Sequence, residues 1–214
     1  MELLARYTKT TIMNSNTFIS SEPQVQYKSL NEIPVSGASN YGTTENEVVY
    51  TEYSANPKKT SDNCIQNGPV SVFDVAKYIL KKLGEPCSTM KLHKLLYYCQ
   101  AWNLVWEETP LFTQPIEAWA NGPVIRQLFN FHRGLYQLKY TDLAIGNEDA
   151  LSAKQKENID EVLDFYGKKT AQWLIDQTHI EKPWQDARKG LASNERGDVV
   201  ITLDAMQEYY SSLT

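Results

Sequence analysis

The sequence has no excess of basic residues. Its 21 Lys and Arg are outnumbered by 26 Asp and Glu in 214 residues, which gives a formal net charge of -5. Proteins that bind along nucleic acid need clustered cations that displace the counterions of the phosphates. The charge balance therefore argues against nucleic acid as the main partner, although it leaves a local basic patch open.

Cysteine is scarce, and long apolar runs are missing. Cys64, Cys87 and Cys99 are odd in number and widely spaced, so the disulfide framework of a small secreted protein is not expected. The first residues lack the basic and apolar regions of a signal peptide, and no run approaches the ~18 apolar residues of a membrane span. We expect a soluble cytoplasmic protein with reduced thiols and no membrane contact.

Motifs for catalysis and for metal or phosphate binding are also missing. The sequence contains no C-x-x-C or H-x-x-x-H spacing and no G-x-x-x-x-G-K loop. His93 and Cys99 are six residues apart on one predicted helix, roughly 120° from each other, and cannot pair as base and nucleophile. An enzyme would have to depend on Cys87, near a predicted helix N-terminus, or on His132. We expect no enzyme activity, no cofactor and no metal.

The strongest positive signal is an apolar helix predicted over residues 88–107, capped by Ser88 or Thr89. Two opposite faces of this helix are apolar, so it has to be buried on two sides. One face holds Leu92, Leu95, Cys99, Trp102 and Trp106, and the other holds Tyr97, Ala101, Leu104 and Val105. Two narrow polar lines remain, Lys91, Lys94 and Tyr98 on one side and His93, Gln100, Asn103 and Glu107 on the other. We expect these lines to face water or a partner.

The chain divides near residue 68. Residues 1–68 are rich in Ser, Thr, Asn and Pro, with short extended patches at 25–30 and 48–53, and they show no helical period. A segment of this composition buries too little apolar surface to offset its ordering entropy. We expect a largely irregular N-terminal extension, either a mobile tail or an arm that binds a partner, followed by one domain over residues 69–214.

Periodicity and capping signals place several more helices around the central one. Ser71 with Asp74 and Ser152 with Gln155 resemble capping boxes, and they open predicted helices at 72–83 and 153–166. Pro123 is expected at the first position of another helix, with Val124, Leu128, Phe131 and Leu135 facing inward. Further helices are predicted at 171–178 and 203–210, and residues 197–202 read as a strand that can pair with 116–119. The fold class is mainly α, a compact multi-helix domain around a buried central helix with room for a short two-stranded β element.

Two clusters suggest contacts with other molecules. Four lysines surround the turn between the first two helices, either as a solvated face or as a contact for an acidic partner or phosphate: Lys81, Lys82, Lys91 and Lys94. Five tryptophans are present in a domain of this size. Core packing accounts for most of them, yet Trp and Tyr are also the usual anchors of binding interfaces.

Several motifs in a fixed order resemble one known family. These are Lys94-Leu-Leu-Tyr-Tyr-Cys-Gln100 with Ala101-Trp102, then Pro110-Leu-Phe112, Ile116-Glu-Ala-Trp119, Asn121-Gly-Pro-Val124 and Pro183-Trp184. Together they resemble the Panacea domain, the SocA-like antitoxin family that also occurs in phage-associated proteins, over about residue 70 to the end. Cys99 stands where a small residue is usual in the family. The extension 1–68 lies outside the resemblance.

The resemblance implies a protein without enzyme activity that neutralises a co-encoded protein toxin by direct binding, or delivers it to an AAA+ protease. We predict that the partner contacts an exposed edge of the central helix and the surface beside it, formed by Lys91, Lys94, Tyr98, Gln100, Trp119, Pro123 and Trp184. The alternatives are a nucleic-acid-binding transcriptional regulator and a phage-associated anti-defence binding protein.

Overall fold

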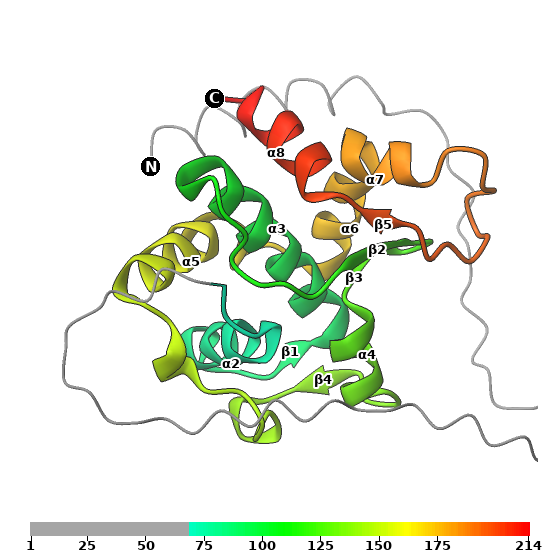
Figure 1. Ribbon diagram of the computed structural model, residues 1–214. Helices are drawn as coiled ribbons and strands as arrows, with labels where there is room; N and C mark the ends of the chain where they lie inside the picture. Colours follow the sequence, from blue (N-terminus) through cyan, green and yellow to red (C-terminus); the bar gives the residue numbers. More distant parts are fainter. Residues whose placement is uncertain (1–68) are drawn as a thin grey trace, which may run out of the picture.

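The computed structural model describes residues 69–214, and the predictions for residues 1–68 lie outside this range. Within the described range the chain forms seven α-helices, two short 3-10 helices and five short strands (Figure 1). The prediction of a mainly α domain is therefore confirmed. None of the helices in this part of the chain is long and apolar enough to cross a membrane.

Helix α3, Thr89–Glu107, runs through the middle of the domain. Every residue from Leu92 to Leu104 is buried, so the helix has no exposed face over more than three turns. It contacts α2, α5, α6 and α8 as well as strand β3 (Figure 1). Ser88 caps its first turn by accepting a hydrogen bond from the Lys91 N–H, and Glu108 ends it in the left-handed conformation. The predicted burial of this helix is confirmed. The two polar lines that were expected to face water or a partner are buried as well over residues 92–104.

The surrounding helices begin and end at the signals in the sequence. Helix α2, Val72–Leu83, opens with the Ser71–Asp74 capping box and closes at Gly84, whose φ is 68°. Helix α5, Ala153–Tyr166, opens with the Ser152–Gln155 capping box. The remaining helices are α4, Arg126–His132, α6, Ala171–Ile180, α7, Lys182–Ala187, and α8, Leu203–Ser211. Local side-chain-to-backbone bonds therefore set most helix boundaries.

Two small antiparallel sheets complete the domain. Strand β2, Ile116–Trp119, lies between β3, Gly122–Val124, and β5, Val200–Ile201. The pairing of Ile116 with Ile201 confirms that residues near 200 pair with 116–119. Strands β1, Cys87–Ser88, and β4, Gln137–Leu138, form the second sheet, which connects the start of α3 to the segment after α4.

The prediction of a helix starting at Pro123 is wrong. Pro123 lies in β3, opposite Ala118, and α4 begins only at Arg126. Proline has no N–H to donate, and β3 is an edge strand of its sheet, where this loss is tolerated. Because the helix starts later and is short, Leu128 faces the core whereas Phe131 and Leu135 are 39% and 52% exposed.

One hydrophobic core joins all of these elements. It extends in sequence from Val72 of α2 to Tyr210 of α8, with the side chains of α3 at its centre. Trp102, Tyr97 and Tyr98 are fully buried, and the ring of Tyr98 stacks on Tyr166 at a centroid distance of 4.0 Å. Burying a large aromatic side chain contributes about 1.5–3 kcal/mol, so this cluster supplies much of the driving force for folding.

Gly122 provides a test of how tightly the hairpin packs on α3. Its φ is +94°, and a Cβ would lie 2.6 Å from Lys94 Cε and 2.8 Å from Thr178 Oγ1. We expect Gly122→Ala to lower the free energy of unfolding by about 1–3 kcal/mol for the backbone and about 1–3 kcal/mol more for the overlap. Gly190, with a φ of +92° and open space around it, is the matched control. Urea denaturation of Gly190→Ala should show the backbone cost alone, and equal losses in the two variants would contradict the predicted packing.

Candidate functional site

The predicted exposed edge of α3 does not exist in the structure. Lys94 and Tyr98 are 0% exposed and Gln100 is 1% exposed, and Pro123 is buried too. Lys91 is partly buried and donates a hydrogen bond from Nζ to the Gly167 carbonyl at 2.7 Å. The prediction failed because a helix packed on all sides turns its polar side chains toward backbone groups of neighbouring segments rather than toward water.

Gln100 holds the chain segment that follows α3. Its Oε1 accepts hydrogen bonds from the Leu111 N–H at 3.0 Å and the Phe112 N–H at 3.1 Å. Its Nε2 donates to the Phe112 carbonyl at 2.9 Å. One side-chain amide therefore satisfies three backbone groups, as a neighbouring strand would. This explains in physical terms why a glutamine on α3 and a Pro-Leu-Phe segment occur together in the sequence.

Lys94 holds the β2–β3 hairpin in the same way. Its Nζ donates to the Pro123 carbonyl of β3 at 2.9 Å, and no carboxylate pairs with it among the described residues. Complete burial lowers the pKa of Lys94 to about 7. The amine thus anchors strand β3 to α3, and its burial disfavours the charged form because it removes a cation from water.

Tyr98 contacts a buried carboxylate instead of a partner. Its hydroxyl donates to Glu181 Oε1 at 3.1 Å, and the Tyr210 hydroxyl of α8 donates to Oε2 at 2.7 Å. Glu181 is 0% exposed and lies at the junction of α6 and α7. Three segments far apart in the sequence therefore meet at one carboxylate, which ties α8 and the α6–α7 corner to the central helix.

One of the two predicted tryptophans, Trp184, bonds to the strand that holds the other, Trp119. Trp184 Nε1 donates to the Trp119 carbonyl at 2.9 Å, and its ring stacks on His179 at 4.2 Å. The Trp119 indole donates to Glu117 Oε2 at 2.8 Å and lies beneath the Arg126 guanidinium. Both rings are partly exposed. A partner-binding role for Trp119 and Trp184 stays a prediction.

The four lysines around the α2–α3 turn do not form a free basic patch. Lys81 pairs with Glu148 at 3.2 Å and Lys82 pairs with Asp160 at 2.9 Å. Lys91 and Lys94 are engaged with backbone carbonyls. With two cations paired and two directed inward, the feature that favoured a nucleic-acid-binding regulator is lost.

A large cavity lies elsewhere, around the first turns of α3. Its volume is about 980 Å³, and its walls come from the start of α3, the β2–β3 hairpin, α4, the loop before β4, the start of α6 and residues 194–196. Of the seven residues predicted to bind the partner, Trp119 is the one that lines it. Leu135 and Tyr136 also line it, and they are 52% and 90% exposed.

Two histidines form a buried pair in the cavity wall. His93 Nε2 and His132 Nε2 are 2.9 Å apart, and His93 Nδ1 accepts a hydrogen bond from the Ile125 N–H at 3.2 Å. Each ring is 3% exposed, and burial lowers the pKa of both. The sequence did not indicate this pair, because its members are 39 residues apart and are brought together only by the hairpin between them.

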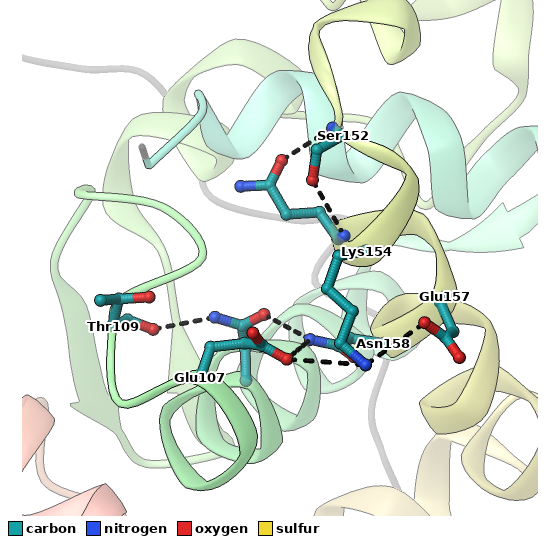
Figure 2. Close-up of polar contacts among 8 residues, drawn as sticks. Glu107, Thr109, Ser152, Lys154, Glu157 and Asn158 are labelled. Atoms are coloured by element: carbon teal, nitrogen blue, oxygen red, sulfur yellow. Dashed lines mark hydrogen bonds and ion pairs between the residues drawn. The ribbon is translucent and has the colours of Figure 1, made fainter. Parts of the chain in front are cut away.

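A second, smaller hollow of about 190 Å³ lies between the end of α3 and the start of α5. Figure 2 shows Lys154 and Asn158 of α5 reaching toward Glu107 of α3. Asn158 Nδ2 donates to Glu107 Oε1 at 3.0 Å and to Asn103 Oδ1 at 3.1 Å, and Lys154 Nζ lies 3.8 Å from Glu107. These polar groups hydrogen-bond one another, so this hollow joins two helices and is not the candidate site.

The residues considered for catalysis lie in unreactive surroundings. Cys87 lies just before the N-terminus of α3, but it is 3% exposed, and burial raises the pKa of its thiol to about 11. Burial also raises the pKa of Cys99. Among residues 69–214 no group of three or more His, Cys, Asp or Glu side chains could hold a metal ion.

The geometry of residues 69–214 defines a mainly α domain that has buried hydrogen bonds between segments and a large cavity around the start of α3. Residues 92–185 match the family model described as "Antitoxin SocA-like, Panacea domain". The resemblance inferred from the motifs is thereby confirmed, and the match extends from α3 into α7. Helices α2 and α8 lie outside the match, although Tyr210 of α8 completes the contacts of Glu181. No curated protein and no solved structure matches the chain.

Replacing Gln100 tests its role as a tie between α3 and the following segment. We expect Gln100→Leu to lower the free energy of unfolding by about 3 kcal/mol or more, because buried N–H and carbonyl groups that lose a partner cost about 1–3 kcal/mol each. Gln127 of α4 is exposed, and Gln127→Leu is the control, with a change of less than about 0.5 kcal/mol. Chemical denaturation measures both free energies of unfolding. A loss of stability in Gln100→Leu close to that in Gln127→Leu would contradict the proposed role of Gln100 in holding residues 111–112.

The buried amine of Lys94 predicts a pH dependence of stability. The unfolded chain holds this proton up to about pH 10.4, whereas the folded chain releases it near 7, so the unfolded state binds more protons between these values. Stability should therefore rise by up to about 2 kcal/mol between about pH 7 and about pH 8.5, below the range in which Cys87 acts in the opposite direction. Urea denaturation of Lys94→Met should lack this rise, whereas Lys82→Met should keep it. The same slope in wild type and Lys94→Met would show that Lys94 is not the source.

Proposed function

We propose that this chain is an antitoxin that neutralises a protein toxin by direct protein–protein binding and catalyses no reaction. The observation that carries the proposal is the match of residues 92–185 to the SocA-like antitoxin model. Two further observations support it. Burial raises the pKa of the Cys87 thiol, which does not favour a cysteine nucleophile, and Lys81 and Lys82 are paired with carboxylates, which does not favour a phosphate contact. The buried Cys87 and Cys99 suit a reducing cytoplasm.

The structure supports recognition through a rigid surface. The buried hydrogen bonds of Gln100, Lys94 and Glu181 hold the β2–β3 hairpin and the helices around the cavity in place. Because these segments are already ordered, binding a partner should cost them little conformational entropy. Large apolar side chains are exposed at the mouth of this cavity, as is typical of interface anchors. The partner surface we propose is therefore this mouth with Trp119, and not the buried side of α3.

Co-expression with the neighbouring reading frame tests the proposed function. We expect the neighbour's product to arrest growth when expressed alone, and growth to recover when this chain is produced with it. Purification should then yield a stoichiometric complex of the two full-length proteins. A neighbour that is harmless alone, or a recovery without any complex between the two proteins, would contradict the proposal.

The same experiment separates sequestration from delivery to an AAA+ protease. Under sequestration the cellular amount of toxin stays constant while growth recovers. Under delivery the toxin disappears, and it reappears in a strain that lacks the protease. We expect a constant amount, because a rigid apolar mouth can hold the toxin without help from a third protein.

A further inference from the structure

The wall of the cavity around the start of α3 contains a buried hydrogen-bond donor that no other residue among 69–214 accepts from. A neutral imidazole carries its proton on one nitrogen only. His93 Nδ1 accepts from the Ile125 N–H, so the proton of His93 is on Nε2. That N–H donates to His132 Nε2 at 2.9 Å, and the proton of neutral His132 is therefore on Nδ1.

This N–H of His132 is buried and has no hydrogen-bond partner in another described residue, although burial lowers the pKa of the ring and a contact with its own backbone partly offsets this. An unpaired buried donor costs about 1–3 kcal/mol, which makes it an attachment point for any acceptor that reaches it. The ring cannot turn its other nitrogen outward without giving up the bond to His93. The backbone N–H of Ile125 therefore fixes, through two rings, a donor in the wall of the cavity.

The rest of the lining combines apolar side chains with neutral polar ones such as Asn121, Gln172 and Asn194, and its formal charge has one sign. Among the described residues that line the cavity, Arg196 is the one with a full charge, and none is acidic. Met90, Val124, Phe129 and Ile175 contribute apolar surface inside, and Leu135 and Tyr136 are exposed at the mouth. In a chain of net charge -5, a cavity with a cation and no anion suits an apolar group that carries a carboxylate.

We propose that this cavity is the toxin-docking site. An apolar side chain of the toxin fills it, an acceptor of the same segment receives the His132 Nδ1–H, and a neighbouring carboxylate pairs with Arg196. The inference rests on the proposed function, and it specifies the chemistry of the toxin segment as apolar and acidic. Trp119, which lies beneath both Arg126 and Arg196 at 5.3 and 5.9 Å, forms the side of the cavity next to the charge.

Small probes test the chemistry of the cavity without the toxin. Phenylacetate combines a ring with a carboxylate, phenethylamine replaces the carboxylate by a cation, and benzyl alcohol is neutral. In NMR titrations of the full chain, phenylacetate should shift the Trp119 indole signal and the His132 Nδ1 signal, and phenethylamine should shift neither. Arg196→Gln should weaken phenylacetate binding at least tenfold and leave benzyl alcohol unaffected. No shift with phenylacetate, or equal shifts with phenethylamine, would overturn the proposal.

Growth rescue tests the same site with the toxin present. Leu135→Ala and Tyr136→Ala should lose rescue and complex formation, whereas Ile145→Ala and Ile180→Ala should keep both. The two controls also remove large exposed apolar side chains, 59% and 51% exposed, which do not line the cavity. Thermal unfolding of all four variants is the control that checks whether each one is folded.

The two proposals fail in different ways. If the neighbour is toxic and rescued equally by all four variants, the docking site is wrong and the proposed function stands. If the neighbour is harmless, the proposed function is wrong, and the phenylacetate titration still decides the chemistry of the cavity.

Discussion

The fold depends on one constraint, the complete burial of α3 from Leu92 to Leu104. A helix without an exposed face has to satisfy every polar side chain it carries within the protein. Lys94, Tyr98, Gln100 and Asn103 each do so by bonding to a different segment: the hairpin, the α6–α7 corner, the segment at 111–112 and the turn at Thr109. The polar residues of α3 thus determine where its neighbours lie, and the apolar ones supply the driving force.

The same constraint separates the family motifs from the surface proposed to bind the toxin. The residues that carry the resemblance are mostly ties inside the domain, so they identify the fold more directly than the contact with a partner. Of the predicted partner-binding residues, Trp119 lines the large cavity and Trp184 donates a hydrogen bond to its carbonyl. Leu135 and Tyr136 are exposed and take no part in these internal hydrogen bonds, so we expect substitutions there to leave the interior intact.

Much of the fold could be predicted from the sequence, because local signals determine it. The capping boxes at Ser71 and Ser152, Gly84 at the end of α2 and the apolar character of α3 all lie in short stretches of chain. The site could not be predicted, because its parts meet only in three dimensions. Polar residues on α3 look like an exposed edge until the segments that accept their hydrogen bonds are known, and Pro123 fits a helix start as well as an edge strand. The pairing of His93 with His132 likewise follows from the path of the β2–β3 hairpin.

Native-state hydrogen exchange of the α3 amides tests the central claim most directly. If α3 is the internal scaffold, the amides of residues 92–104 should exchange only through global unfolding, with an opening free energy equal to that measured by urea denaturation. Amides of α4, at the edge of the cavity, should open at lower free energy. Exchange of the α3 amides through a smaller local opening than those of α2 and α8 would contradict the account.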